Sequence, residues 1–163
     1  MDRNKLNETL KQHKLWIDSK SREGKRARLR KSNLEKAQLK SVNLTGADLH
    51  CAFVDGANCR EINLSGSNLR SSSFCGANLV NANIRNADFS YSFLDSAGLA
   101  GADLTGTSLV GVDICNVNLV GAKIDFNIRN VDLFWHVAVS KCQLPWIITH
   151  PKFNMFCDTL NIV

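Results

Sequence analysis

The chain has 163 residues and a mass of 18.0 kDa, which is the size of a single domain. Hydrophobic residues make up 44% of it, and no apolar run approaches the roughly 20 residues that cross a bilayer, so the composition excludes a membrane-spanning helix. The net charge of +5 is unevenly divided. Residues 1–46 carry 13 Lys/Arg against 5 Asp/Glu, whereas residues 47–126 carry 4 against 8. A basic first part therefore precedes a mildly acidic body.

The first 20 residues predict an amphipathic helix over residues 4–20, with Leu6, Leu10 and Ile17 near one face and Trp16 beside them. We expect this helix to cap whatever follows it. The stretch lacks the apolar segment of an export signal. No CxxC pair occurs among the six cysteines, so we expect reduced thiols and a cytoplasmic protein; they are Cys51, Cys59, Cys75, Cys115, Cys142 and Cys157.

From Ala27 to Phe126 the chain divides into twenty consecutive units of five residues. We number each unit from its third residue, i, which is apolar in all twenty units and Leu in thirteen. Position i−2 is Ala in eleven units and Ser in four, position i−1 is Asn or Asp in twelve, and i+2 is Gly in eight. A period of five fits neither the 3.6 of a helix nor the 2 of a strand, so the chain must turn about every five residues.

One large and one small apolar residue per unit suit a narrow interior, and Asn, Asp and Gly supply the turns between units. The expected core consists of the large residues at position i, which are Leu29, Leu34, Leu39, Leu44, Leu49, Leu64, Leu69, Phe74, Leu79, Ile84, Phe89, Leu94, Leu99, Leu104, Leu109, Ile114, Leu119 and Ile124.

This pattern resembles the pentapeptide-repeat family, whose consensus A(D/N)Lxx is matched by ANL at 77–79 and by ADL at 47–49 and 102–104. The resemblance implies an all-β solenoid: a right-handed quadrilateral parallel β-helix of about five to six coils, with four units per coil. For function the resemblance is a weak guide, because one architecture serves many ends.

Stacking every fourth unit divides the exterior into four faces. The second face combines units 32–36, 52–56, 72–76, 92–96 and 112–116. Its charged residues sum to −3, and it places Phe53 and Phe93 at i−1, where the family usually has Asn or Asp. Aromatic residues among carboxylates are typical of an interaction surface, although isolated exposed aromatics are an equally weighted alternative. The candidate interaction residues are Glu35, Phe53, Asp55, Phe93, Asp95 and Asp113.

The repeat frame slips by one residue after Asp125, so that Ile128 and Leu133 become the i positions of a last, irregular half coil. Eighteen of the 31 residues 133–163 are apolar, and both prolines, Pro145 and Pro151, lie among them, so we predict that residues 136–163 form an irregular C-terminal cap. Because fluoroquinolone-resistance members of the family dimerise through their C-terminal ends, the resemblance also implies a homodimer formed by this segment. The predicted domains are 1–26 (capping helix and linker), 27–135 (β-helix) and 136–163 (cap or dimerisation segment).

No catalytic pattern emerges. His136, Cys142, His150 and Cys157 match no common zinc spacing, and the serines at 71–73 have no nearby His and Asp to activate them. We therefore expect neither enzyme activity nor a metal or cofactor.

The sequence favours a non-enzymatic protein-interaction or scaffold protein. The alternative is a DNA mimic, since some members of the family resemble duplex DNA and protect or inhibit DNA gyrase. With nine basic and nine acidic residues over 27–126, such mimicry would be confined to the second face and the later coils. Nucleic-acid binding through the basic front end is a more distant alternative.

Overall fold

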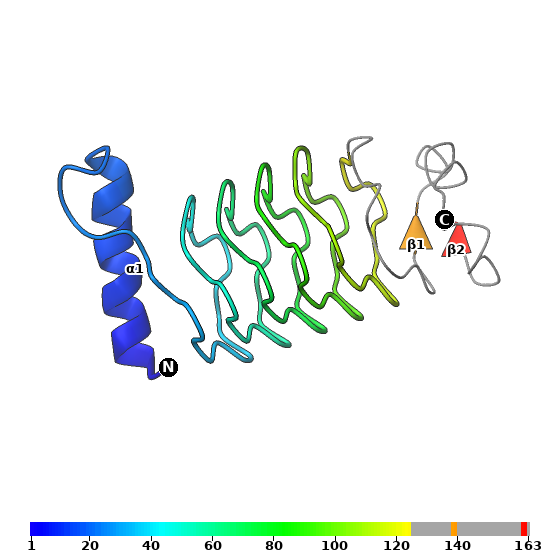
Figure 1. Cartoon of the computed structure of the whole chain (residues 1–163), viewed down its shortest axis with the longest axis horizontal. Coiled ribbons are helices and arrows are strands. Elements are labelled where there is room, and N and C mark those ends of the chain that lie inside the picture. Colours follow the sequence, from blue (N-terminus) through cyan, green and yellow to red (C-terminus); the bar gives the residue numbers. More distant parts are fainter. Residues whose placement is uncertain (125–137, 140–160, 163) are drawn as a thin grey trace.

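The computed structural model describes residues 1–124, 138–139 and 161–162. Helix α1 (Arg3–Asp18) lies across one end of a stack of similar coils (Figure 1). The short strands β1 (Ala138–Val139) and β2 (Asn161–Ile162) pair in parallel. The predicted half coil, C-terminal cap and dimerisation segment lie outside the described residues, apart from these two strands.

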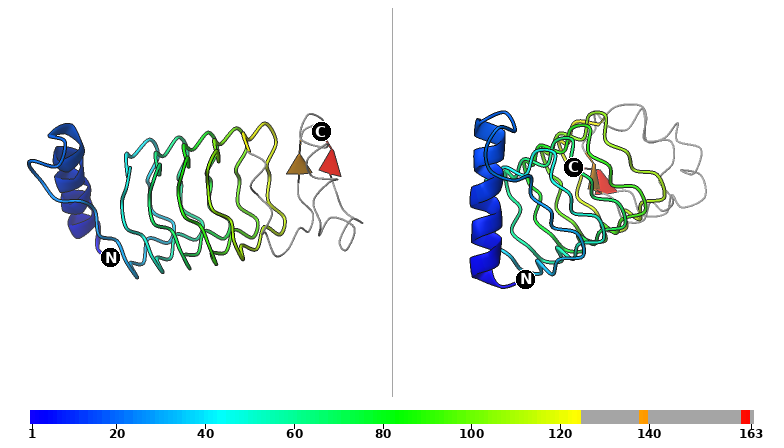
Figure 2. Two further views of the ribbon diagram at one scale, coloured as in Figure 1. Left: turned by 45° about the horizontal axis from the view of Figure 1, so that its top comes forward. Right: turned by 60° about the vertical axis from the view of Figure 1, so that its left-hand side comes forward.

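Successive coils are joined by parallel bridges between residues twenty apart, such as Arg28 with Asp48 and Asp103 with Lys123. Each bridging residue occupies position i−1, so every unit between residues 27 and 124 contributes a single bridged residue, and within these described coils no regular strand forms before the next turn. Twenty residues per coil are four units, and Figure 2 shows the coils stacked in register. At a sheet spacing of about 4.8 Å, each coil adds one rung to the rod.

The backbone hydrogen bonds of a unit run mainly between coils. Around Phe53, for example, the Phe53 N–H donates to Ser32 O (2.9 Å) and the Leu34 N–H donates to Phe53 O (2.7 Å). The turn that follows is closed within the coil by the Ala37 N–H, which donates to Leu34 O (3.0 Å). Repetition of this arrangement pairs the backbone polar groups that point towards the neighbouring coils.

Each five-residue unit ends in a corner, because the residue at every i+2 position from Lys31 to Gly121 has a positive φ. Eight of these residues are Gly, for which the left-handed region carries no steric penalty. The others include bulky residues such as Glu61 (φ 57°) and Tyr91 (φ 62°), for which that conformation costs roughly 1–2 kcal/mol each. The corners explain why a period of five fits neither helix nor strand.

The interior is filled by the i and i−2 side chains. Every i residue from Leu29 to Leu119 is buried, and Ile124 is partly buried. Phe74 and Phe89 pack edge to face, with ring centroids 5.2 Å apart. Buried serines at i−2 bond to backbone carbonyls of the preceding unit, as Ser67 Oγ does to Leu64 O. The core is therefore a column of large residues separated by small ones.

Helix α1 begins one residue earlier and ends two residues earlier than the helix expected over residues 4–20. Asp2 caps its first turn by accepting from the Lys5 N–H (2.8 Å), and the chain reverses after Ser19 because Lys20 and Ser21 adopt positive φ. Leu6 and Leu10 pack against the core, as the amphipathic pattern predicts.

The residue of α1 that is fully buried is His13, which the apolar pattern did not identify. Its Nδ1 accepts from the Ala27 N–H (3.0 Å) at the start of the first coil, and its ring stacks on Trp16. His13 therefore joins the helix to the solenoid by a directed bond as well as by packing.

Candidate interaction surface

The outward side chains at i−1 normally serve the backbone of their own unit. Asn78 Oδ1 accepts from the Val80 N–H (3.2 Å), and each Asn or Asp at i−1 in the described coils makes the same bond to the N–H of i+1. This bond explains the preference of the repeat for Asn and Asp at i−1, since a short side-chain acceptor supports the turn.

Phe53 and Phe93 occupy i−1 positions of the second face and cannot make this bond. They lie in one column, in which Ser73 of the intervening coil pairs with Phe53 on one side and with Phe93 on the other. A small side chain therefore separates the two rings. Phe53 is 49% exposed and Phe93 is 55% exposed. Each position therefore lacks a hydrogen bond worth about 1 kcal/mol and gains little apolar burial in exchange.

Two carboxylates of the second face are engaged in bonds between coils. Asp55 is half-buried and accepts from the Cys75 N–H (2.8 Å) and the Ser73 hydroxyl of the next coil. Asp95 accepts from Asn116 Nδ2 (2.9 Å). The two carboxylates therefore hold neighbouring coils in register and add negative charge near the rings.

The other two predicted acidic residues are less closely associated with the rings. Asp113 occupies the i−1 column after Phe93 and supports its own turn through the Cys115 N–H (3.0 Å). Glu35 is exposed in the first coil, one rung before Phe53. In the i−1 column Asp113 therefore follows Phe93, whereas Glu35 occupies an i+1 position of the first coil and is not part of that column.

Tyr91 and Val110 extend the exposed apolar area beyond the second face. Tyr91 is 53% exposed and stands at the corner before Phe93, with only buried Ser92 between them in the chain. Its N–H donates to Val110 O (2.7 Å), and the Arg70 guanidinium lies 5.3 Å from its ring centroid. Sequence reasoning missed Tyr91 because it considered i+2 only as a turn position; an aromatic residue where glycine is favoured was the available signal.

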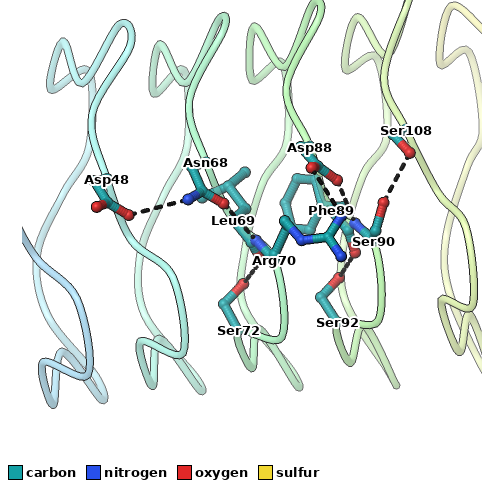
Figure 3. Close-up of polar contacts among 10 residues, drawn as sticks. All are labelled: Asp48, Asn68, Leu69, Arg70, Ser72, Asp88, Phe89, Ser90, Ser92 and Ser108. Atoms are coloured by element: carbon teal, nitrogen blue, oxygen red, sulfur yellow. Dashed lines mark hydrogen bonds and ion pairs between the residues drawn. The ribbon is translucent and has the colours of Figure 1, made fainter.

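Elsewhere on the coils, opposite charges neutralise one another between coils. Arg70 of one coil pairs with Asp88 of the next (3.2 Å), and Arg85 pairs with Asp103 in the same way (Figure 3 shows the first pair). Burial acts to raise the pKa of Asp88, but hydrogen bonds from Ser90 and Arg70 and the Arg70 charge outweigh it, so the pKa lies below its usual value. This carboxylate is therefore firmly ionised and paired.

The described residues contain no group of three or more His, Cys, Asp or Glu side chains suited to a metal ion. Cys51, Cys59 and Cys75 are free thiols, and burial raises the pKa of Cys59 to about 12. Within the same part of the chain, α1 is too short and too polar to cross a membrane.

Known proteins share the repeat and the fold. The chain resembles the structure of QnrB1, a plasmid-mediated fluoroquinolone resistance protein, with 18% identity over 79% of this chain and 74% of that one, at a TM-score of 0.50. It also resembles pentapeptide repeat proteins from Cyanothece 51142 (Rfr23; 23% identity, 71% and 68% coverage, TM-score 0.49) and Nostoc PCC 7120 (alr5209; 22% identity, 94% and 93% coverage, TM-score 0.44). No curated protein matches the chain.

The family model for pentapeptide repeats matches eight copies in three overlapping stretches, residues 25–58, 57–97 and 94–125. Together they run from residue 25 to residue 125, which is more than half of the 163 residues. With the fold shared with QnrB1, this identifies the coils as a right-handed β-helix solenoid. The chain belongs to the pentapeptide repeat family.

Proposed function

We propose that the protein is a non-enzymatic interaction module whose binding surface consists of Phe53, Tyr91 and Phe93, hereafter the aromatic surface. The observation that carries this proposal is that all three rings are about half exposed at positions where local structure favours other residues. The two phenylalanines forgo the turn-supporting bond, and Tyr91 adopts a strained φ. Local strain and lost bonds without compensating burial are concentrated at functional sites.

The partner that fits this surface is a protein presenting apolar side chains beside Lys or Arg. The rings supply area that a partner can bury, and Asp55, Asp95 and Asp113 supply negative charge that favours the approach of a basic surface. In this proposal the protein is a rigid cytoplasmic scaffold of five to six coils with a cap at each end. The free thiols Cys51, Cys59 and Cys75 support this compartment.

The test is replacement of both phenylalanines by the residue that the repeat prefers. The F53N/F93N variant should lose the partner captured by the wild-type protein, while its melting temperature stays equal or rises because each Asn restores a turn bond. The matched control is N43S/N83S, which alters two i−1 positions with the same separation on another face. It should retain the partner. Equal capture by F53N/F93N and wild type would refute the aromatic surface.

The alternative function is that of a DNA mimic acting on an enzyme such as DNA gyrase. A mimic must offer dense, unneutralised negative charge. Here Asp48, Asp88 and Asp103 each pair with an arginine of the preceding coil, which favours the interaction module. A supercoiling assay decides between the two: inhibition or protection of gyrase by wild type, lost on reversing Asp55, Asp95 and Asp113 to Lys, would establish the alternative.

A further inference from the structure

A second surface, distant in sequence from the aromatic surface, lies where α1 meets the first coil. After α1 the chain doubles back along the helix (Figures 1 and 2). Residues of both segments line a hollow of about 880 Å³. The helix contributes Glu8, Thr9, Gln12 and Trp16, and the returning chain contributes Ser21, Gly24, Lys25, Arg26 and Arg28. This volume is within the usual range for small-ligand sites.

The returning chain is held closely against the helix, so the shape of the hollow is preformed. The Lys25 N–H donates to Gln12 O (3.1 Å). Gly24 has a φ of 71°, and a Cβ at this position would lie 2.3 Å from the same carbonyl oxygen. Only glycine permits this approach. A preformed wall lowers the ordering cost of binding.

The hollow is positively charged. Lys25, Arg26 and Arg28 line it against the single carboxylate of Glu8, and the Glu8 carboxylate already accepts a hydrogen bond from Gln12 Nε2 (3.0 Å). Within the described chain, none of the three cations forms an ion pair. Arginine and lysine in this number, without carboxylate partners, favour phosphate groups as ligands.

The hollow also offers an aromatic ring and neutral polar groups. Trp16 is half-buried and lines the hollow, whereas the His13 ring stacked on it at 5.5 Å does not, so one side of the indole is supported from within. Thr9, Gln12 and Ser21 add hydroxyl and amide groups. A supported indole beside cations suits a ligand that has a planar ring as well as phosphate.

We propose that this hollow binds a nucleotide, either free or as part of a single nucleic-acid strand. The phosphates lie against Lys25, Arg26 and Arg28, and the base stacks on Trp16. The site is independent of the aromatic surface, since no residue is shared between them.

The test is calorimetric titration of the full chain with ATP, with tripolyphosphate and with a short single-stranded DNA. Wild type should bind ATP saturably, and K25Q/R28Q should weaken that binding by about tenfold or more, the effect of losing charge-assisted hydrogen bonds. The matched control is K11Q/K40Q, which removes the same charge from exposed residues outside the hollow and should change the affinity by less than about twofold. Equal loss in both double variants would overturn the proposal, because attraction would then depend on overall charge.

Trp16 separates ring recognition from charge recognition. W16L should weaken the affinity for ATP by about tenfold and leave the affinity for tripolyphosphate unchanged. W16F keeps an aromatic ring and should retain most of the wild-type affinity for ATP. Unchanged tripolyphosphate binding also shows that W16L keeps its fold. Equal affinity of wild type for ATP and tripolyphosphate, or no saturable binding of ATP, would overturn the proposal. Tighter binding of the DNA strand than of ATP, again sensitive to W16L, would identify a strand as the source of the nucleotide.

Discussion

Asn78 and Leu79 are neighbours in the chain, yet they occupy opposite environments. Leu79 is fully buried at an i position, whereas Asn78 is exposed and accepts from the Val80 N–H. Leu79→Asp places an unpaired charge in a dry core and should lower the free energy of unfolding by more than about 4 kcal/mol. Asn78→Asp keeps the side-chain acceptor and should change the free energy of unfolding by about 0.5 kcal/mol or less. Denaturant unfolding of both variants measures the difference; similar midpoints would contradict the assigned inward positions.

Residue-scale burial was largely predictable because the repeat specifies it. An apolar residue recurs at i in every unit, and i−2 is Ala or Ser in fifteen of the twenty, so the inward direction of Leu79 follows from its place in the repeat. His13 and Tyr91 could not be placed in this way. A single His on a helix gives no periodic signal, and its burial depends on the Ala27 N–H, which only the folded chain brings near. The bonds of Asp55 to the next coil were likewise hidden, because the repeat predicts its outward direction but not its partners.

His13 should make the stability of the protein depend on pH. Burial lowers its pKa below the ordinary 6.5, and the Arg26 charge adds to the effect, while the Thr45 backbone partly offsets it. The unfolded chain therefore binds a proton more readily than the folded one. The free energy of unfolding should be highest above about pH 6.5 and decrease as the pH falls below it.

Thermal unfolding of the wild type and of H13Q, between about pH 7.5 and 5.5, measures this contribution. H13Q removes the titrating group and should flatten the dependence. The matched control H50Q alters a half-buried histidine of the second coil and should preserve it. A slope that is the same in wild type and H13Q would show that His13 is not the responsible group.

At the scale of elements, the loop after α1 packs closely on the helix. Gly24 is the point of closest approach, with Gln12 O, Leu15 Cβ and Trp16 N all within 2.7 Å of where a Cβ would be placed. These are mostly backbone atoms that cannot move aside easily. The packing of this loop on α1 therefore depends on glycine for space as well as for its positive φ.

Gly24→Ala should displace this loop and lower the melting temperature more than Gly66→Ala. Gly66 has nearly the same φ (62°), but a Cβ there meets nothing within 4 Å, so its cost is only the left-handed conformation, roughly 1 kcal/mol. Thermal unfolding of the two variants isolates the steric contribution. Equal losses would mean that the loop accommodates the methyl group without displacement.

At the scale of the whole molecule, removing one unit should rotate everything after it by one face. Removing residues 57–61 should leave a folded solenoid, since each unit supplies equivalent core residues, but it places Phe93 on a different face from Phe53. Removing residues 37–41 should destabilise the protein to a similar extent and keep Phe53, Tyr91 and Phe93 together. Partner binding should be lost in the first deletion and retained in the second. Binding by both would show that Phe53 and Phe93 do not act jointly.

The recurrence of the corner every five residues gives each outward side chain two coordinates, an azimuth and a height. The remainder after dividing a residue number by twenty specifies the azimuth, and the quotient specifies the height. Only two of every five residues, i and i−2, point into the interior. The other three can therefore be substituted without changing the azimuth or height of any neighbouring side chain. Two proteins with this repeat can therefore share a backbone and present unrelated exteriors. The repeat therefore fixes where each outward side chain lies, and substitution at these positions changes the surface without changing the backbone.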